Sequence, residues 1–155
     1  MSVDLAKHVF GAGEGEQLRW GGPAAGSVTI MVDPENSGPT DLCVLTQSLD
    51  PGSAVPVHRH EKAEQVLFIV SGGGQISLAD RRVEARAGAT VHIPAGVAHG
   101  IVNTGDEPLT ILEITSPPGF EKIFREMHSL GEPSAEDIAR IGTKYDIVVD
   151  PIEAP

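Results

Sequence analysis

The sequence is poor in cysteine, aromatic residues and long apolar runs. Its single cysteine, Cys43, can form no internal disulfide, which fits a reducing compartment. No stretch approaches the roughly 18 apolar residues that a membrane-spanning helix requires. Residues 1–20 are polar and glycine-rich, unlike a secretion signal. These absences predict a soluble, cytoplasmic protein with no membrane partner.

Basic residues are also scarce. The 11 Lys and Arg residues are outnumbered by 22 Asp and Glu, which gives a net charge of −11, and aromatic residues make up only 4% of the chain. Nucleic-acid binding needs a basic face and often aromatic side chains for base stacking. We therefore expect no nucleic-acid partner. The length of 155 residues suits one domain.

Short β-branched and apolar segments, separated by turn sequences, are the main feature of the chain. The expected strands are residues 27–32, 42–49, 65–70, 75–78, 82–86, 90–93, 100–103 and 109–114. Strands this short, with turn signals roughly every eight to twelve residues, predict an all-β barrel or sandwich. Residues 1–20 are only weakly patterned and are expected to form an arm.

After Pro117 and Pro118 the pattern changes to that of a helix. An apolar stripe has the spacing of one helix face: Phe120, Ile123, Phe124, Met127 and Leu130. Ser134 is expected to cap a second helix. We therefore divide the chain into a barrel with its N-terminal arm, residues 1–116, and a helical tail, residues 117–155, packed on the barrel or on a partner subunit. The apolar stripe needs cover, which favours a homodimer.

Three histidines form the strongest candidate site. His58 and His60 are two residues apart in an extended segment, so their side chains lie on the same side. His99 follows a turn-rich run, and Glu64 or Gln65 could supply a fourth group. Neutral imidazole is the commonest transition-metal ligand in proteins, so this pattern predicts a metal site.

The residues around these histidines resemble the signatures of the cupin superfamily. Gly52, His58 and His60 open the first signature, G-x5-H-x-H. The second, G-x5-P-x-G-x2-H-x3-N, is matched at every fixed position by Gly88, Pro94, Gly96, His99 and Asn103. The resemblance covers roughly residues 40–116. It implies one antiparallel double-stranded β-helix, the jelly-roll barrel, with a divalent metal in its mouth.

The fourth ligand is ambiguous in the sequence. The spacing to Gly72 places Gln65 where cupins usually have Glu, and some cupins use Gln there. Ligand chemistry favours Glu64, because a carboxylate binds a hard cation better than an amide does. Strand alternation cannot decide, because the residues that follow on both faces are apolar. The expected ligands are therefore His58, His60, His99 and Gln65, with Glu64 as the alternative.

The resemblance implies metal-dependent chemistry on a small, possibly anionic or enolic molecule. Iron, manganese, nickel, cobalt and zinc all suit such ligands. A quercetinase-like dioxygenase is the first hypothesis; a non-redox isomerase, cyclase or lyase and a non-catalytic binding module are the alternatives. No catalytic residue can be assigned. Glu113 is expected at a solvated strand position, with a pocket acid as the alternative, and His92 is expected to be a packed or surface residue.

Overall fold

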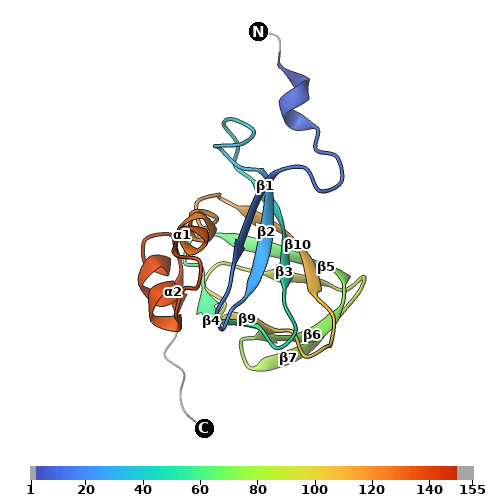
Figure 1. Cartoon of the computed structure of the whole chain (residues 1–155), viewed down its shortest axis with the longest axis vertical. Helices are drawn as coiled ribbons and strands as arrows, with labels where there is room; N and C mark the ends of the chain where they lie inside the picture. Colours follow the sequence, from blue (N-terminus) through green and yellow to red (C-terminus); the bar gives the residue numbers. More distant parts are fainter. Residues whose placement is uncertain (1–2, 150–155) are drawn as a thin grey trace.

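The computed structural model describes residues 3–149 and consists mainly of antiparallel β-strands arranged in two sheets (Figure 1). The first sheet contains, in spatial order, β1 (Glu16–Trp20), β2 (Gly26–Val32), β3 (Cys43–Leu49), β10 (Leu109–Ser116), β5 (Glu64–Ser71) and β8 (Thr90–Ile93). The second contains β11 (Val148–Val149), β4 (Ala54–Arg59), β9 (His99–Val102), β6 (Gly73–Leu78) and β7 (Arg81–Arg86). The expected all-β jelly-roll fold is confirmed.

Two short helices follow the barrel, as the change of period predicted. These are α1 (Lys122–Leu130) and α2 (Ala135–Gly142). Ser134 caps α2: its hydroxyl oxygen accepts from the Asp137 N–H at 3.1 Å, and the Asp137 carboxylate accepts from the Ser134 N–H at 3.0 Å. This reciprocal pair satisfies two backbone donors that the helix itself cannot. None of the helices in residues 3–149 is long and apolar enough to cross a membrane.

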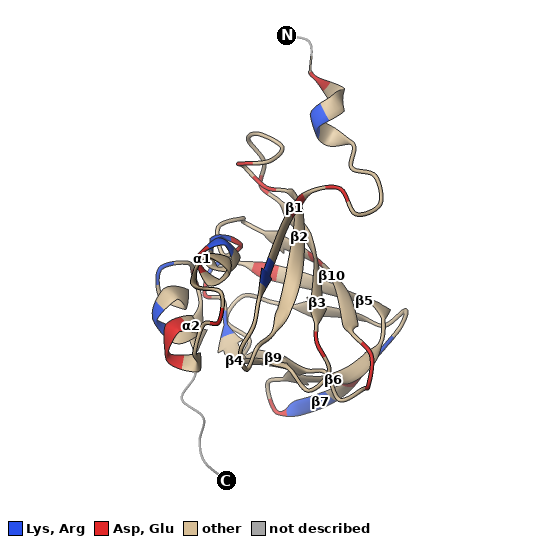
Figure 2. Cartoon of the chain, viewed as in Figure 1, with Lys and Arg blue, Asp and Glu red and all other residues tan. Residues whose placement is uncertain are grey.

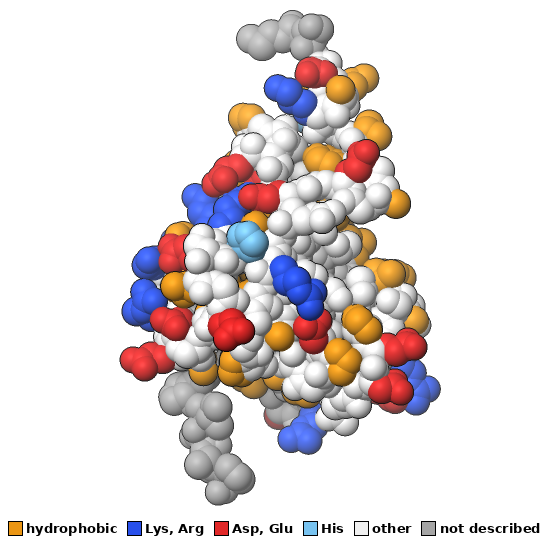
Figure 3. Space-filling model, in the orientation of Figure 1, with side chains coloured by type: hydrophobic (Ala, Val, Ile, Leu, Met, Phe, Trp, Pro, Cys, Tyr) orange, Lys and Arg blue, Asp and Glu red, His pale blue; other side chains and the backbone are white. Residues whose placement is uncertain are grey.

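The N-terminal region differs from the expected arm in one respect. Residues Glu16–Trp20 form β1, which pairs with β2, and Leu18 and Trp20 are buried. Two apolar residues in a five-residue strand were too weak a signal to detect. Upstream, a short 3-10 turn, η1 (Leu5–His8), extends away from the barrel (Figures 1 and 3). Hydrophobic side chains on this arm are exposed: Val3, Leu5 and Val9.

The buried side chains form two apolar clusters with polar residues between them. The helix-side cluster joins β1, β2 and β3 to the helices, and includes Leu45 and Phe124. The barrel cluster fills the other end and includes Leu49 and Leu67. Along β3, Gln47 is buried between Leu45 and Leu49. Gln65, His99 and Glu113 are also buried and line one cavity with Gln47, and His60 and Thr115 are further buried polar residues. The candidate site therefore lies in a polar layer inside the core.

The helix α1 packs on the barrel of its own chain. Phe120, Phe124 and Met127 are each at most 6% exposed, and the Phe124 ring stacks on Trp20 with centroids 5.4 Å apart. The argument for a homodimer from this apolar stripe is therefore wrong, because the barrel itself supplies the cover. Amphipathicity predicted the buried face of the helix but could not identify the surface that covers it.

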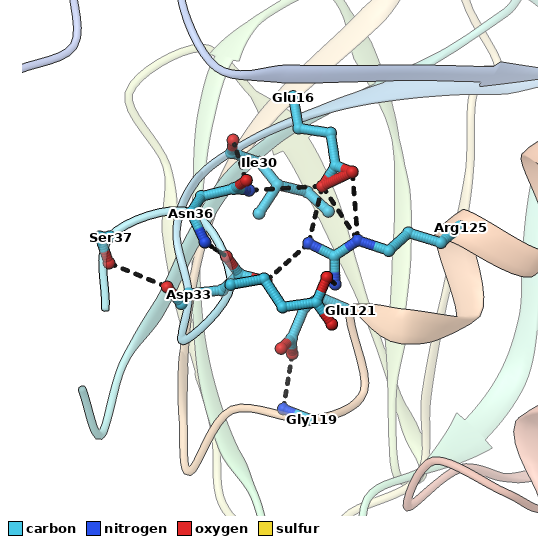
Figure 4. A network of polar contacts seen from close by, with 9 residues as sticks. Glu16, Ile30, Asp33, Asn36, Ser37, Gly119, Glu121 and Arg125 are labelled. Carbon is cyan, nitrogen blue, oxygen red and sulfur yellow. Dashed lines mark hydrogen bonds and ion pairs between the residues drawn. The ribbon is translucent and has the colours of Figure 1, made fainter. Parts of the chain in front are cut away.

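An ion-pair network fixes α1 to the first sheet (Figure 4). The Arg125 guanidinium contacts Glu16 of β1 at 2.6 Å and Asp33, just beyond β2, at 2.7 Å. The Asp33 side chain is fully buried. Nearby, the Glu121 carboxylate accepts from the Gly119 N–H at 2.6 Å, at the start of α1. Charged residues elsewhere are dispersed: in Figure 2, Lys and Arg appear at separate places on β1, the helices and β7.

Candidate metal centre

Two neighbouring strands bring the three predicted histidines together. His58 on β4 is the register partner of His99 on β9, and His60 follows β4 directly. The His60 carbonyl accepts from the Gly96 N–H at 2.7 Å, which holds the turn before His99 against this strand end. One potential ligand atom from each of the three histidines lies within 4.8 Å of the other two.

All three imidazoles are held in the same tautomer. Nδ1 of His58 donates to the Pro56 carbonyl at 2.8 Å, and Nδ1 of His99 donates to the Val97 carbonyl at 2.9 Å. Nδ1 of His60 donates to the Asp146 carbonyl at 3.0 Å. A carbonyl oxygen can only accept, so Nδ1 carries the proton and the Nε2 lone pair stays free. This outer-shell arrangement is the one that orients metal-binding histidines.

The free nitrogens fit a cation. Nε2 of His60 is buried and has no hydrogen-bond partner among the described residues, and a buried polar atom without a partner is costly. Burial lowers the pKa of His58 to about 3 and that of His60 to about 4, with further lowering by the neighbouring His99. The pKa of His99 is also lowered by burial. The three rings are therefore neutral at pH 7, as metal binding requires.

Gln65 and Glu64 lie on opposite faces of β5. Gln65 is 2% exposed and lines the same cavity as His58 and His99. Its side-chain amide donates to the Thr115 hydroxyl at 3.2 Å, which leaves the amide oxygen as the donor atom for a cation. The Glu64 side chain is 60% exposed and pairs with His92 at 2.9 Å. Of the two candidates, Gln65 lies on the histidine side of the strand, and His92 is the surface residue expected.

Glu113 is buried, so the expectation that it occupies a solvated strand position is wrong. It is 6% exposed in the middle of β10, and its Oε2 has no hydrogen-bond partner among the described residues. Burial raises its pKa from 4.5 to about 7. It lines the cavity together with His58, His99 and Gln65. The alternative expectation, a pocket acid, is correct: Glu113 is a carboxyl beside the histidines, with no partner among residues 3–149.

The cavity next to the histidines has a volume of about 70 Å³ and is partly covered by the C-terminal tail. Its polar side chains are Gln47, His58, Gln65, His99 and Glu113. The opposite wall is apolar and comes mainly from the tail: Phe120, Ile123, Phe124, Met127, Ile138, Ile147 and Val149. The chemistry of this site is therefore limited to small molecules held between a polar floor and an apolar cover.

No pattern in the sequence indicated that Asp146 contributes to the site. Asp146 follows α2 with a left-handed backbone, φ +58°, and its carbonyl accepts the His60 ring proton. Its carboxylate accepts from the backbone N–H groups of Glu61, Lys62 and Ala63 at 3.1–3.2 Å. A single acidic residue in an irregular C-terminal segment carries no local pattern that points 86 residues back along the chain.

Comparison with known proteins places the chain in a family. Residues 45–115 match the cupin domain family. An uncharacterized protein of Streptomyces coelicolor is 32% identical over 50% of this chain and 72% of its own length. Auxin-binding protein 1 of Arabidopsis thaliana is 36% identical over 56% of this chain, which spans only 48% of that protein.

Solved structures agree on the fold. A predicted oxalate decarboxylase from Thermotoga maritima superposes with a TM-score of 0.62 at 23% identity, covering 71% of this chain and 99% of the other. At this identity the likeness concerns the fold alone. The chain belongs to the cupin family. It is a cupin whose three clustered histidines could bind a metal ion.

Proposed function

We propose that this protein is a metal-dependent enzyme that moves a proton on a small organic molecule. The observation that carries the proposal is the buried carboxyl of Glu113, which has no partner among residues 3–149 and shares one cavity with His58 and His99. An acid or base poised near neutral pH beside a Lewis-acid site suits proton abstraction and return. The proposed reaction is therefore an isomerisation, a cyclisation or an elimination. This is the non-redox alternative that was inferred from the sequence.

The metal ligands, Glu113 and the helix α1 have different roles in the proposed reaction. His58, His60, His99 and Gln65 would hold a divalent transition metal, which would polarise a substrate oxygen. All four are neutral, so the charge of the ion stays uncompensated by its ligands, and an anionic or enolic oxygen is favoured. Glu113 accepts a proton from the bound molecule and returns it at another atom. The apolar cover formed by α1 excludes water that would compete for the proton.

A quercetinase-like dioxygenase was the first hypothesis drawn from the sequence. It is the second candidate function here. Its support is the apolar wall of the cavity, in which dissolved oxygen is more soluble than in water. Oxygenase chemistry needs a redox-active ion, so zinc would not support it. The two candidates differ in a simple observable, because only the oxygenase consumes oxygen.

The test compares wild type with Glu113→Gln, each loaded with manganese, iron, cobalt, nickel or zinc. A panel of small carbonyl acids in D₂O is followed by proton NMR for exchange of the carbon-bound hydrogen, with an oxygen electrode in parallel. We expect exchange by wild type, at least 100-fold slower exchange by the variant, and equal metal content. Oxygen uptake without exchange would favour the dioxygenase. Ligand binding with neither reaction would favour a binding module, the role that the name of the Arabidopsis auxin-binding relative gives to that protein.

We also propose that the protein forms a homodimer, now for a different reason. The outer face of the first sheet carries neighbouring apolar side chains on β5 and β10: Ile114 is in register with Val66, and Leu112 with Phe68. Phe68 and Ile114 are 40% and 37% exposed. An apolar row of this kind on a sheet is a common subunit interface.

A further inference from the structure

We infer that the ligand of the candidate metal centre is a small mono-anion with an apolar body, an inference that rests on the proposed metal function. Among the described residues, neither Lys nor Arg lines the cavity. Arg125 lies on α1, but its guanidinium is held by Glu16 and Asp33. A ligand whose second negative group cannot reach the metal would therefore bury that group without a cation, which is costly.

Among the lining residues that the structure describes, Glu113 is the only acid. A second anionic group would meet either that carboxyl or the apolar cover. The indole N–H of Trp20 donates to the Ala24 carbonyl at 2.7 Å, so the ring contributes apolar surface and no free donor. These walls match a ligand that has one anionic oxygen group directed at the histidines and hydrocarbon elsewhere.

The size of the cavity restricts the hydrocarbon part. Its volume is about 70 Å³, whereas an engineered cavity of about 150 Å³ accommodates benzene. A branched aliphatic acid of a few carbons fits this space with α1 in place. The proposed class therefore excludes phosphorylated sugars and dicarboxylates whose second carboxylate lies away from the metal.

The test uses the cobalt-loaded protein and its visible absorption. Acetate, isobutyrate, succinate and inorganic phosphate are titrated separately. Each buried CH₂ contributes about 0.8 kcal/mol, so isobutyrate should bind roughly tenfold more tightly than acetate. Succinate and phosphate should bind at least tenfold more weakly than isobutyrate. Equal or tighter binding of succinate or phosphate overturns the ligand class while leaving the metal site intact. A protein that takes up no cobalt overturns both.

A matched pair of variants makes the test sharper. Val149 and Val148 are adjacent and half-buried on β11, but only Val149 lines this cavity. Val149→Lys places a cation in the wall and should raise the affinity for succinate relative to isobutyrate at least tenfold. Val148→Lys adds the same charge outside the cavity and should leave the ratio unchanged. An unchanged ratio in Val149→Lys, or the same shift in both variants, contradicts the inference.

A second inference rests on hydrogen bonds instead of the cavity: the geometry points to Asp146 as a positioning residue for the metal centre. Its carbonyl fixes the His60 ring, while its carboxylate gathers three consecutive backbone N–H groups directly after His60. Two residues later, β11 pairs with β4, where Val149 is the register partner of His58. The tail after α2 thus holds two of the three histidines in place.

The test replaces the carboxylate and keeps the backbone. Asp146→Gly tolerates the left-handed conformation and retains the carbonyl, but it releases the three N–H groups. We expect metal affinity to fall 10- to 100-fold, as for other outer-shell residues, with a changed cobalt spectrum. Asp146→Asn keeps one acceptor oxygen and should recover part of both properties. Lys144→Ala is the control, because Lys144 lies two residues away and its ammonium group contacts Glu126 at 3.2 Å.

A purely structural role would give a different result. If Asp146 only stabilises the fold, Asp146→Gly lowers the melting temperature of the metal-free protein, while the folded fraction keeps wild-type metal affinity and spectrum. That result would overturn the inference.

Discussion

At the scale of single residues, the neighbours Glu64 and Gln65 determine the charge of the proposed metal centre. Gln65→Glu introduces a negative charge on the buried side of β5, beside the histidines. We expect this change to tighten metal binding at least tenfold, about 1.4 kcal/mol, and to weaken the binding of anions. Competition titrations against a chromophoric chelator measure the first effect, and acetate titration measures the second.

Glu64→Gln is the control for that experiment. Glu64 pairs with His92 on the outer face, so this change should leave metal affinity within twofold of wild type. A loss of more than tenfold in Glu64→Gln, with Gln65→Glu unchanged, would mean that the carboxylate is the ligand after all.

The buried carboxyl of Glu113 predicts a pH-dependent stability. Burial raises its pKa from 4.5 to about 7. Below pH 4.5 the carboxyl is neutral in both the folded and unfolded states. As pH rises towards 7 the unfolded state loses its proton first, so folding stability falls, by about 3 kcal/mol in total. Glu113→Gln removes this loss.

Urea unfolding of the metal-free proteins at pH 4 and pH 8 tests this prediction. The free energy of unfolding of Glu113→Gln minus that of wild type should be about 3 kcal/mol larger at pH 8 than at pH 4. A difference that is the same at both pH values would show that Glu113 is hydrated or paired in solution.

The residue types of the site were visible in the sequence, but some orientations were not. His58 and His60 could be grouped because residues two apart in an extended chain lie on the same side, and His99 joined them through the second cupin signature. Glu113 could not be placed, because it stands between Leu112 and Ile114 and either face of such a strand can be buried. Only the pairing of β10 with both β3 and β5 fixes the face to which Glu113 belongs.

At the scale of elements, Arg125 holds α1 against the first sheet. Arg125→Ala should leave the fully buried Asp33 without its cation and destabilise the protein by about 3 kcal/mol. Because α1 covers the cavity, the same variant should also weaken isobutyrate binding to the cobalt-loaded protein. Chemical denaturation and the absorption titration measure the two effects.

Arg140→Ala is the matched control for this element. Arg140 lies on α2 with a side chain 58% exposed, and its pair with Asp137 is a surface contact. Such pairs contribute about 0–1 kcal/mol. Similar losses in both variants would show that the buried network of Figure 4 has no special role in fixing the helix.

Elements with a clear period were predicted well, and short ones were not. Most strands and both helices follow from runs of apolar residues and turn sequences. The two-residue β11 has no period of its own; it exists because its backbone pairs with β4. Contacts of this kind depend on the path of the chain in three dimensions, which local patterns do not contain.

At the scale of the whole molecule, the proposed homodimer can be tested on the outer face of the first sheet. Phe68→Lys should weaken association at least tenfold, because a charge would be buried in the interface. Val102→Lys, at a similarly exposed position on β9 of the other sheet, should not. Sedimentation velocity across a range of micromolar concentrations measures both. A wild-type protein that is monomeric throughout that range would contradict the proposal.

The division of the core into two apolar clusters has a consequence for the local unfolding of the protein. Because a polar layer separates them, the helix-side cluster can lose its order while the barrel cluster stays folded. We therefore expect the amide protons of α1 and α2 to exchange with solvent at a lower opening free energy than those of β5 and β10. Metal should slow exchange in the tail after α2, because Asp146 joins that segment to His60. Partial unfolding of the helices would then widen access to the cavity, at a rate that hydrogen exchange can measure directly.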